Sequence, residues 1–172
     1  MTYTQYIHSS LGKIFFASDG EALTGLWFEG QKYFGSTLEA QAEVVQVPQR
    51  KQLPIFEVTQ EWIQVYYSGK EPDFTPKLAL QGTHFQKQVW KALLEIPFGT
   101  TTSYGAIAKK LAVARGISKI SAQAVGTAVG RNPISIIVPC HRVLGADGSL
   151  TGYAAGTSIK RALLELEGRC NE

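Results

Sequence analysis

Hydrophobic positions near the start of the chain fall into three short runs. They are rich in Tyr, Ile, Phe, Leu and Trp and cover residues 3–7, 12–17 and 22–28. The sequence Ser18-Asp19-Gly20, between the second and third runs, is a turn signal. Aromatic and β-branched runs separated by turn residues are typical of neighbouring strands. We therefore predict a small antiparallel sheet over residues 3–28.

The pattern of residues 29–82 predicts helix followed by a linker. Residues 29–53 are more polar, with a weak helical pattern around Ser36 to Val45. A clearer helix runs from about Phe56 to Tyr67, is ended by Ser68-Gly69, and has an apolar face of Val58, Trp62, Val65 and Tyr66. Residues 70–77 contain two prolines and no periodicity, so we place a domain boundary near residues 72–82. We assign residues 1–78 to a first domain and 79–172 to a second.

The second domain opens with three predicted helices. Thr83 and Gln86 have the spacing of a capping box, and the helix after them has an apolar stripe of Phe85, Val89, Trp90, Leu93 and Leu94 that ends at residues 96–99. Ser103 can cap a second helix to about Leu111, which buries Ile107, Ala108 and Leu111. After a basic loop at residues 115–119, Ser121 can cap a third helix to about Val129. The last two form a helix-turn-helix. Together with the sheet predicted for the first domain, these helices predict an α+β fold for the whole chain.

The last predicted helix runs from about Thr157 to Glu167 and is stopped by Gly168. Its apolar positions Ile159, Ala162, Leu163 and Leu166 are expected to face the core. Lys160 and Arg161 lie in its first turn and Glu165 and Glu167 in its last, which opposes the helix macrodipole at both ends. A carboxylate at the C-terminal end of a helix is explained if it has a specific partner, although an exposed charge can also tolerate the unfavourable interaction with the macrodipole. The helix position does not distinguish Glu165 from Glu167.

A candidate reactive residue follows a β-branched run. Residues 134–138 read as a buried strand that Pro139 ends, and the strand would present Cys140, followed by His141 and Arg142. A cation close to sulfur favours the nucleophilic thiolate, yet a cysteine at a strand end is as often a small core residue. Neighbouring residues on extended backbone point to opposite faces, so a bridging water is the expected link between His141 and the thiol.

Composition places the chain among globular proteins. It has 172 residues, of which 44% are hydrophobic and 18% charged, and it contains no apolar run long enough to cross a bilayer. Its first residues lack the pattern of a signal peptide, so we predict a cytoplasmic protein without a membrane partner. Two cysteines, Cys140 and Cys170, fit free thiols in a reducing compartment.

Charge is divided unevenly along the chain. Residues 1–80 hold six Lys and Arg against nine Asp and Glu, whereas residues 81–172 hold eleven against five, so the halves carry −3 and +6. The helix predicted over residues 122–129 has almost only small side chains apart from Gln123. Small residues allow close approach to another helix or to a nucleic acid groove. Flanking cations that could neutralise phosphates favour DNA as the partner. These cations are Lys109, Lys110, Arg115, Lys119 and Arg131.

Several ordered features together resemble one family. These are Pro139-Cys140-His141-Arg142, Asn132-Pro133, the helix-turn-helix, and Gly152-Tyr153. They resemble the O6-alkylguanine-DNA alkyltransferases, also called methylated-DNA–protein-cysteine methyltransferases, strongly over residues 83–168. The match extends more weakly to Tyr66-Tyr67-Ser68-Gly69 and Phe74. The resemblance implies a ribonuclease-H-like first domain and a mostly helical, winged-helix-like second domain.

The resemblance also implies a reaction. Cys140 would take the alkyl group from O6-methylguanine in DNA, with O4-methylthymine left open as a second substrate, and each protein would act once. His141 would work through a water and be oriented by Glu167, Asn132 would brace the turn that holds Cys140, and Tyr104 would donate a proton to N3 of the leaving guanine. The implied partner is double-stranded DNA containing O6-alkylguanine, bound by a monomer without a cofactor.

The implied DNA contacts follow from base flipping. The target atom is inaccessible in a stacked duplex, so the nucleotide must be extruded by the second helix of the pair from the minor groove. The residues implied to contact DNA are Ser121, Gln123, Ala124, Gly126, Thr127, Lys119 and Arg131. Those implied to form the pocket for the extruded base are Val143, Gly152, Tyr153 and Ala154.

Three features depart from the family pattern. Most members carry an arginine where this chain has Gln123, and its interhelical loop at residues 112–120 looks longer. Some relatives hold zinc in the first domain, but this chain has no cysteine before residue 140 and only His8 and His84 there, so we predict no metal site.

Three other functions compete with repair. A damage sensor resembling the alkyltransferase-like proteins would flip bases without chemistry, but those proteins lack the acceptor cysteine. A transcription regulator could use the helix-turn-helix, although no further sequence-reading domain is evident. A cysteine hydrolase could use Cys140 and His141 as a dyad, but their adjacent placement makes the required hydrogen bond awkward.

Overall fold

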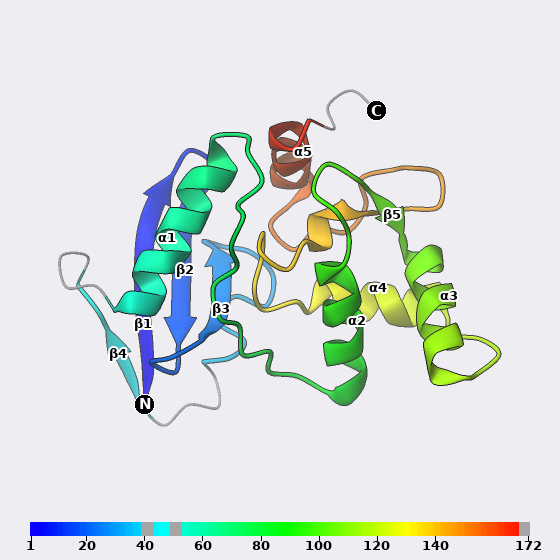
Figure 1. The fold of residues 1–172 in the computed structure, drawn as a ribbon, viewed down its shortest axis with the longest axis horizontal. Coiled ribbons are helices and arrows are strands. Elements are labelled where there is room, and N and C mark those ends of the chain that lie inside the picture. The colour runs from blue at the N-terminus through cyan, green and yellow to red at the C-terminus, as the bar shows by residue number, and fades with distance from the viewer. Residues whose placement is uncertain (39–42, 49–52, 169–172) are drawn as a thin grey trace. The chain divides into compact units, whose positions relative to one another are not determined.

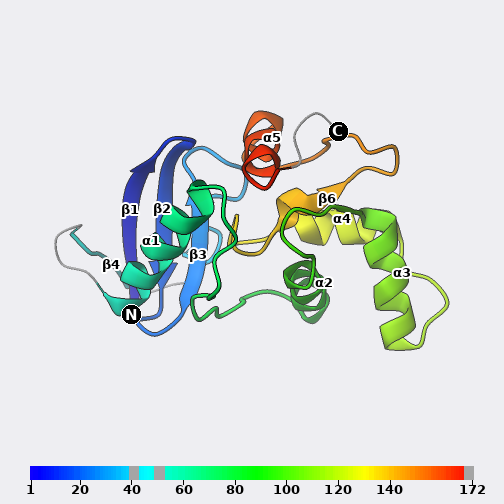
Figure 2. The same cartoon turned by 45° about the horizontal axis from the view of Figure 1, so that its top comes forward.

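The computed structural model describes residues 1–38, 43–48 and 53–168. The chain forms two compact units: residues 1–81 with Pro133–Ser135, and residues 82–132 with Ile136 onward. Within the described residues the fold is α+β, with a small mixed sheet and five helices (Figures 1 and 2). No helix in these ranges is long and apolar enough to span a membrane.

The sheet of the first unit contains the three predicted strands. Strands β1 (Thr2–Ser9), β2 (Gly12–Ser18) and β3 (Leu23–Phe28) pair antiparallel in sequence order. A fourth strand, β4 (Val44–Gln46), pairs parallel with the start of β1. The sheet is therefore mixed rather than antiparallel, because a segment distant in sequence supplies its last strand.

The weak helical pattern around Ser36 to Val45 was misleading in the described residues. Residues 36–38 form turns and residues 44–46 are β4, while residues 39–42 lie outside the described ranges. Val44 and Val45 suit a strand by their β-branched side chains. Pairing with β1 therefore decides the structure of this segment.

Helix α1 (Pro54–Tyr67) lies along one face of the sheet (Figure 1). Its predicted span is confirmed, but its buried face is turned relative to the prediction. Val58 is 36% exposed. Phe56 packs against Phe16 of β2 with ring centroids 5.9 Å apart. The buried residues of the helix are Ile55, Phe56, Thr59, Trp62, Ile63 and Tyr66.

The helices of the second unit are α2 (His84–Leu94), α3 (Tyr104–Arg115), α4 (Ala122–Gly130) and α5 (Thr157–Leu166). Three of the four begin where the capping signals placed them, and the fourth, α5, begins at Thr157 as predicted but without a side-chain cap. The predicted capping box is present: Gln86 N donates to Thr83 Oγ1 at 3.1 Å and Thr83 N donates to Gln86 Oε1 at 3.0 Å. Ser103 and Ser121 cap α3 and α4 as predicted. Helix α3 runs one turn further than expected and ends at Gly116, whose φ of 66° is left-handed.

A buried side-chain hydrogen bond and a short two-stranded sheet connect the elements of this unit. Trp90 of α2 is buried, as its position in the apolar stripe predicted, and its Nε1 donates to the Ala128 carbonyl of α4 at 2.8 Å. Leu94, also expected in that stripe, is 40% exposed. Strand β5 (Thr102–Ser103) pairs parallel with β6 (Val143–Leu144), which brings the start of α3 beside the residues that follow Cys140.

Candidate active site

Cys140 is presented by a tight turn at the end of residues Asn132–Cys140, which we call the cysteine loop. Pro139 has φ −81° and ψ 62°, the geometry of an inverse γ-turn, and Cys140 N donates to Val138 O at 2.8 Å. Val138 O also accepts from Asn132 Nδ2 at 2.9 Å. The chain then forms a 3₁₀ turn over Cys140–Arg142. Asn132 thus braces the turn that fixes the direction of Cys140.

The buried strand predicted over residues 134–138 is wrong. Ile134 makes one isolated bridge, with Leu26 of β3, and residues 135–137 form turns. Ile136 has φ +69°, a conformation that costs a β-branched residue about 1–3 kcal/mol. The predicted burial is correct, because Ile134, Ile136 and Val138 are fully buried. Tertiary contacts therefore override the strand propensity of this segment.

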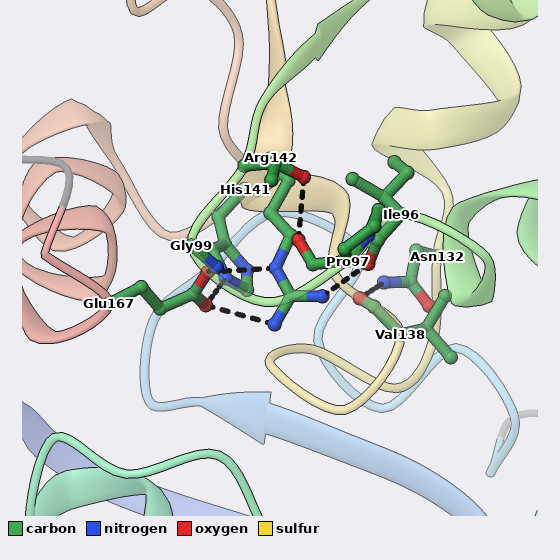
Figure 3. A network of polar contacts seen from close by, with 9 residues as sticks. Ile96, Pro97, Gly99, Asn132, Val138, His141, Arg142 and Glu167 are labelled. Carbon is green, nitrogen blue, oxygen red and sulfur yellow. Dashed lines mark hydrogen bonds and ion pairs between the residues drawn. The ribbon is translucent and has the colours of Figure 1, made fainter.

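Glu167 is the centre of a buried polar network (Figure 3). Its carboxylate lies 2.7 Å from His141 Nε2, and it accepts from Arg142 Nε at 2.8 Å and Nη2 at 3.1 Å. It also accepts from Gly99 N at 3.1 Å. The side chains of Glu167 and His141 are completely buried. A buried carboxylate is stable in such a position only when its oxygens are satisfied in this way.

The network determines the tautomer of His141. A guanidinium is always charged and has no acceptor, so the carboxylate that faces it in a bidentate pair accepts at both oxygens. His141 Nε2 must then be the donor to Glu167, and in the neutral ring Nδ1 carries the lone pair. Burial lowers the pKa of His141 below its ordinary value, against the opposing effect of Glu167. The ring is therefore a neutral base near pH 7.

Arg142 connects this network to the turn that follows α2. Its Nη1 donates to Ile96 O at 2.7 Å, and its guanidinium lies 5.7 Å from the centre of the Phe98 ring. Gly99 has φ +79°, and a Cβ atom there would come within 3.3 Å of Glu167 O. The sequence predicted only that residues 96–99 end a helix. The structure shows that they also hold the arginine and the glutamate.

The thiol of Cys140 is nearly inaccessible, at 7% exposure. Burial raises the pKa of the Cys140 thiol, while hydrogen bonds from Asn132 and Tyr153 and the charge of Lys160 act to lower it. The resting group is thus a thiol, and reaction requires a base to remove its proton. The sequence led us to expect a cation close to sulfur. In the structure this cation is Lys160 of α5, because Arg142 pairs with Glu167 instead.

Lys160 lies in the first turn of α5, as predicted, but its burial was not expected from the sequence. It is 1% exposed, and its Nζ donates to Val143 O at 2.6 Å and to Thr151 O at 2.9 Å. Burial lowers the pKa of Lys160 to about 8. Its spacing from Leu163 and Leu164 puts it on their helical face, which is the sequence signal that could have revealed its burial.

Tyr104, which is expected beside the leaving base, shares the Thr151 carbonyl with Lys160. Tyr104 is the first residue of α3, and its Oη donates to Thr151 O at 3.3 Å. A Cβ atom on Gly152 would lie 3.9 Å from Tyr104 Oη. Val143 and Tyr153 are buried, Tyr153 beside the thiol, and Ala154 is half-buried. Burial raises the pKa of Tyr104, so its hydroxyl keeps its proton.

Helix α4 turns the small residues predicted to contact DNA toward solvent. Val125, Ala128 and Val129 are buried on its opposite face. Gly126 is half-buried, and a Cβ atom added to it would lie 3.6 Å from the Tyr104 ring. The other predicted DNA-contacting residues are all exposed: Lys119, Ser121, Gln123, Ala124, Thr127 and Arg131.

Comparison with known proteins identifies the family. The family model described as 6-O-methylguanine DNA methyltransferase, DNA binding domain, matches residues 84–169. A Methanosarcina acetivorans protein named methylated-DNA–protein-cysteine methyltransferase is 44% identical over 98% of this chain and 99% of its own length. The chain belongs to this methyltransferase family. A Mycobacterium tuberculosis member is 43% identical over 97% of this chain and 93% of its own.

A solved structure agrees over both units of the methyltransferase. The crystal structure of Mycobacterium tuberculosis OGT in complex with DNA has a TM-score of 0.81 and 41% identity, and covers 98% of this chain and 94% of that one. The family resemblance found in the sequence is therefore confirmed. Of the residues that the site brings together, Lys160 and Gly99 had no expected part in the chemistry, whereas Arg142 was expected as a cation near the sulfur and instead pairs with Glu167. Within the described ranges, His, Cys, Asp and Glu side chains form no group of three or more that could hold a metal ion.

Proposed function

We propose that this methyltransferase repairs DNA by moving the alkyl group of O6-alkylguanine onto Cys140. The buried Cys140 thiol beside the His141–Glu167–Arg142 network carries the proposal. The sulfur attacks the alkyl carbon as the carbon–oxygen bond to O6 breaks. The thiol proton passes through a water to His141 Nδ1, and Tyr104 protonates N3 of the departing guanine. Glu167 holds the tautomer that makes Nδ1 the acceptor.

The product explains why we expect one repair event per protein. A thioether gives water neither a good leaving group nor an activated carbonyl, so the site cannot regenerate the thiol. The reaction is therefore stoichiometric in protein. The reactive groups need no cofactor, because the nucleophile, the base and the proton donor are all side chains of this chain.

The target base must leave the duplex to reach a thiol that is 7% exposed. The exposed face of α4 has small side chains that permit close approach to the minor groove, and Lys119 and Arg131 can neutralise phosphates. Val143, Gly152, Tyr153 and Ala154 form the pocket for the extruded base. We propose that O6-methylguanine is the main lesion and O4-methylthymine a second one.

The finer architecture is part of the same proposal. We assign residues 1–78 to a ribonuclease-H-like supporting domain and residues 79–172 to a winged-helix-like domain that binds DNA and accepts the alkyl group. The helix-turn-helix of α3 and α4 supports the second assignment. We expect the protein to act as a monomer, and its cytoplasmic location remains a prediction from the sequence.

The direct test is the mass of the peptide that contains Cys140. After incubation with a duplex carrying one O6-methylguanine, this peptide should gain one methyl group in place of a hydrogen, and repaired lesions should equal protein molecules. The Cys140→Ser variant should leave the lesion in place. An unmodified wild-type peptide with the lesion intact would overturn the proposal, and many lesions repaired per protein would contradict its single-turnover form.

Gln123 provides a second test, aimed at base flipping. Its exposed amide can hydrogen-bond the orphaned cytosine, but it lacks the planar charge of the arginine found in most family members. Gln123→Ala should weaken duplex binding and slow repair by about 3- to 10-fold, the effect of one exposed hydrogen bond. Gln123→Arg should exceed the wild-type rate. Equal affinities and rates for the Gln123→Ala and wild-type proteins would remove this role.

A further inference from the structure

The tip of the cysteine loop is part of the first unit. Residues Pro133–Ser135 are grouped with residues 1–81, whereas Asn132 and Ile136 on either side belong to the second unit. Leu26 N donates to Pro133 O and Ser135 N donates to Leu26 O, both at 2.9 Å. The tip is thus held to strand β3 by two main-chain hydrogen bonds.

A buried glutamine adds a side-chain bond at the same place. Gln31 follows β3 and is 7% exposed. Its Oε1 accepts from Phe28 N at 2.8 Å and from Ser135 Oγ at 3.3 Å. Because a backbone N–H can only donate, the atom that faces Phe28 and Ser135 is the amide oxygen, and the Ser135 hydroxyl is the donor. Ser135, itself 3% exposed, is therefore held at its main-chain nitrogen and at its side chain.

The residue after Ser135 is the strained Ile136, whose φ is +69°. Such a backbone conformation persists only where the neighbours on both sides hold it in place. On the far side, Val138 O is held by Asn132 Nδ2 and Cys140 N. On the near side, Ser135 is held by Leu26 O and Gln31 Oε1. The Gln31 bond is therefore one of the restraints beside Ile136, in the segment that leads to Cys140.

We propose that Gln31 is a positioning residue for alkyl transfer. Through Ser135 it keeps Ile136 in its strained conformation and so sets where the Cys140 thiol lies. This inference rests on the proposed function of Cys140 as the alkyl acceptor. It gives the first unit a specific part in the reaction, exerted along the chain from Ser135 to Cys140.

The experiment compares Gln31→Ala, Ser135→Ala and the double variant. Both single variants remove the bond between Ser135 Oγ and Gln31 Oε1, so each should lower the single-turnover rate of methyl transfer by about tenfold, the factor expected for one buried hydrogen bond. Gln31→Ala also removes the bond from Phe28 N, so Ser135→Ala is the more specific of the two variants. Duplex affinity should stay within about twofold of wild type, because the exposed face of α4 is unchanged. The double variant should be no slower than either single variant, since the bond can be lost only once.

A second readout separates positioning from general loss of stability. The apparent pKa of Cys140, measured without DNA from its reaction with iodoacetamide across pH, should change in Ser135→Ala as the thiol moves relative to Asn132 and Lys160. Ser18→Ala is the matched control: Ser18 is fully buried in the same unit, and its Oγ donates to Ala22 O at 2.7 Å and accepts from Gly20 N at 2.9 Å. This control should keep the wild-type rate and thiol pKa.

Three results would overturn the inference: wild-type rates in Gln31→Ala and Ser135→Ala, multiplied losses in the double variant, or an equal loss in Ser18→Ala. Wild-type protein is assayed in parallel. A wild-type protein that transfers no methyl group would refute the proposed function itself, whereas active wild type with equally active variants would refute only the role of Gln31.

Discussion

Replacing Glu167 by glutamine is expected to slow alkyl transfer by about 10²- to 10⁴-fold, the range that general base catalysis contributes. The carboxylate accepts from both ring and guanidinium donors, with His141 Nε2 at 2.7 Å. An amide can accept at only one atom. With the oxygen engaged by Arg142, the amide NH₂ faces His141 and requires a lone pair on Nε2. The proton then moves to Nδ1, and the ring can no longer take the thiol proton.

The size of this effect follows from the tautomer rather than from lost binding. In catalytic triads, the change from carboxylate to amide beside the histidine costs about 10⁴ in rate for the same reason. Duplex affinity should therefore be retained in Glu167→Gln. Single-turnover rates and equilibrium binding measured on the same duplex separate the two quantities.

The pH dependence of the transfer rate should differ between the wild type and Glu167→Gln in a way that simple destabilisation of the variant would not produce. In the wild type, burial lowers the pKa of His141, so neutral imidazole is present throughout the neutral range and the rate should be nearly flat there. In Glu167→Gln only the small equilibrium fraction of thiolate reacts. Because burial raises the pKa of Cys140, the variant's rate should climb about tenfold per pH unit across this range.

The control for Glu167→Gln is Glu165→Gln, an exposed carboxylate of the same helix. It should leave both rate and pH profile unchanged. A folded Glu167→Gln protein with a wild-type rate would show that His141 is not the base. The same flat profile at a reduced rate would instead indicate a purely structural role for Glu167.

Local signals in the sequence predicted much of the helical framework. Thr83, Ser103 and Ser121 each cap the helix they were expected to cap, because a side chain that bonds the backbone three residues later depends on adjacent residues alone. Gly168 likewise ends the segment where expected, with φ +84°. Helix boundaries of this kind are readable because their physics is local.

Features that depend on distant partners could not be read in this way. Residues 134–138 have the composition of a strand, yet Ile134 alone among them forms a β-bridge. Ile136 takes a left-handed conformation between Ser135 and Val138, which are both held by hydrogen bonds. The spacing of Lys160 places it on the buried face of α5, but the carbonyls of Val143 and Thr151 that accept from its Nζ are not visible from its own sequence position. The position of Glu167 beside His141 came from the family resemblance, since its place in the helix did not distinguish it from Glu165.

Arg142→Met is expected to lower the free energy of unfolding by about 3–5 kcal/mol, the cost of removing one partner from a buried ion pair. Arg142 is 8% exposed and supplies two of the hydrogen bonds to a carboxylate that is fully buried. Methionine fills similar space but leaves the Glu167 charge without its guanidinium. Chemical denaturation at pH 7 measures the loss, and Arg161→Met, an exposed arginine of α5, should change stability by less than about 0.5 kcal/mol.

Two further variants determine where the stability of the pair comes from. Arg142→Lys keeps the charge but loses the planar fork, so it should fall between wild type and Arg142→Met. Removing both charges in Arg142→Met with Glu167→Leu should recover most of the loss, because no carboxylate is then left buried without a partner. If this double variant stays as unstable as Arg142→Met, the loss comes from the arginine's own contacts with Phe98 and the Ile96 carbonyl, and not from the stranded carboxylate.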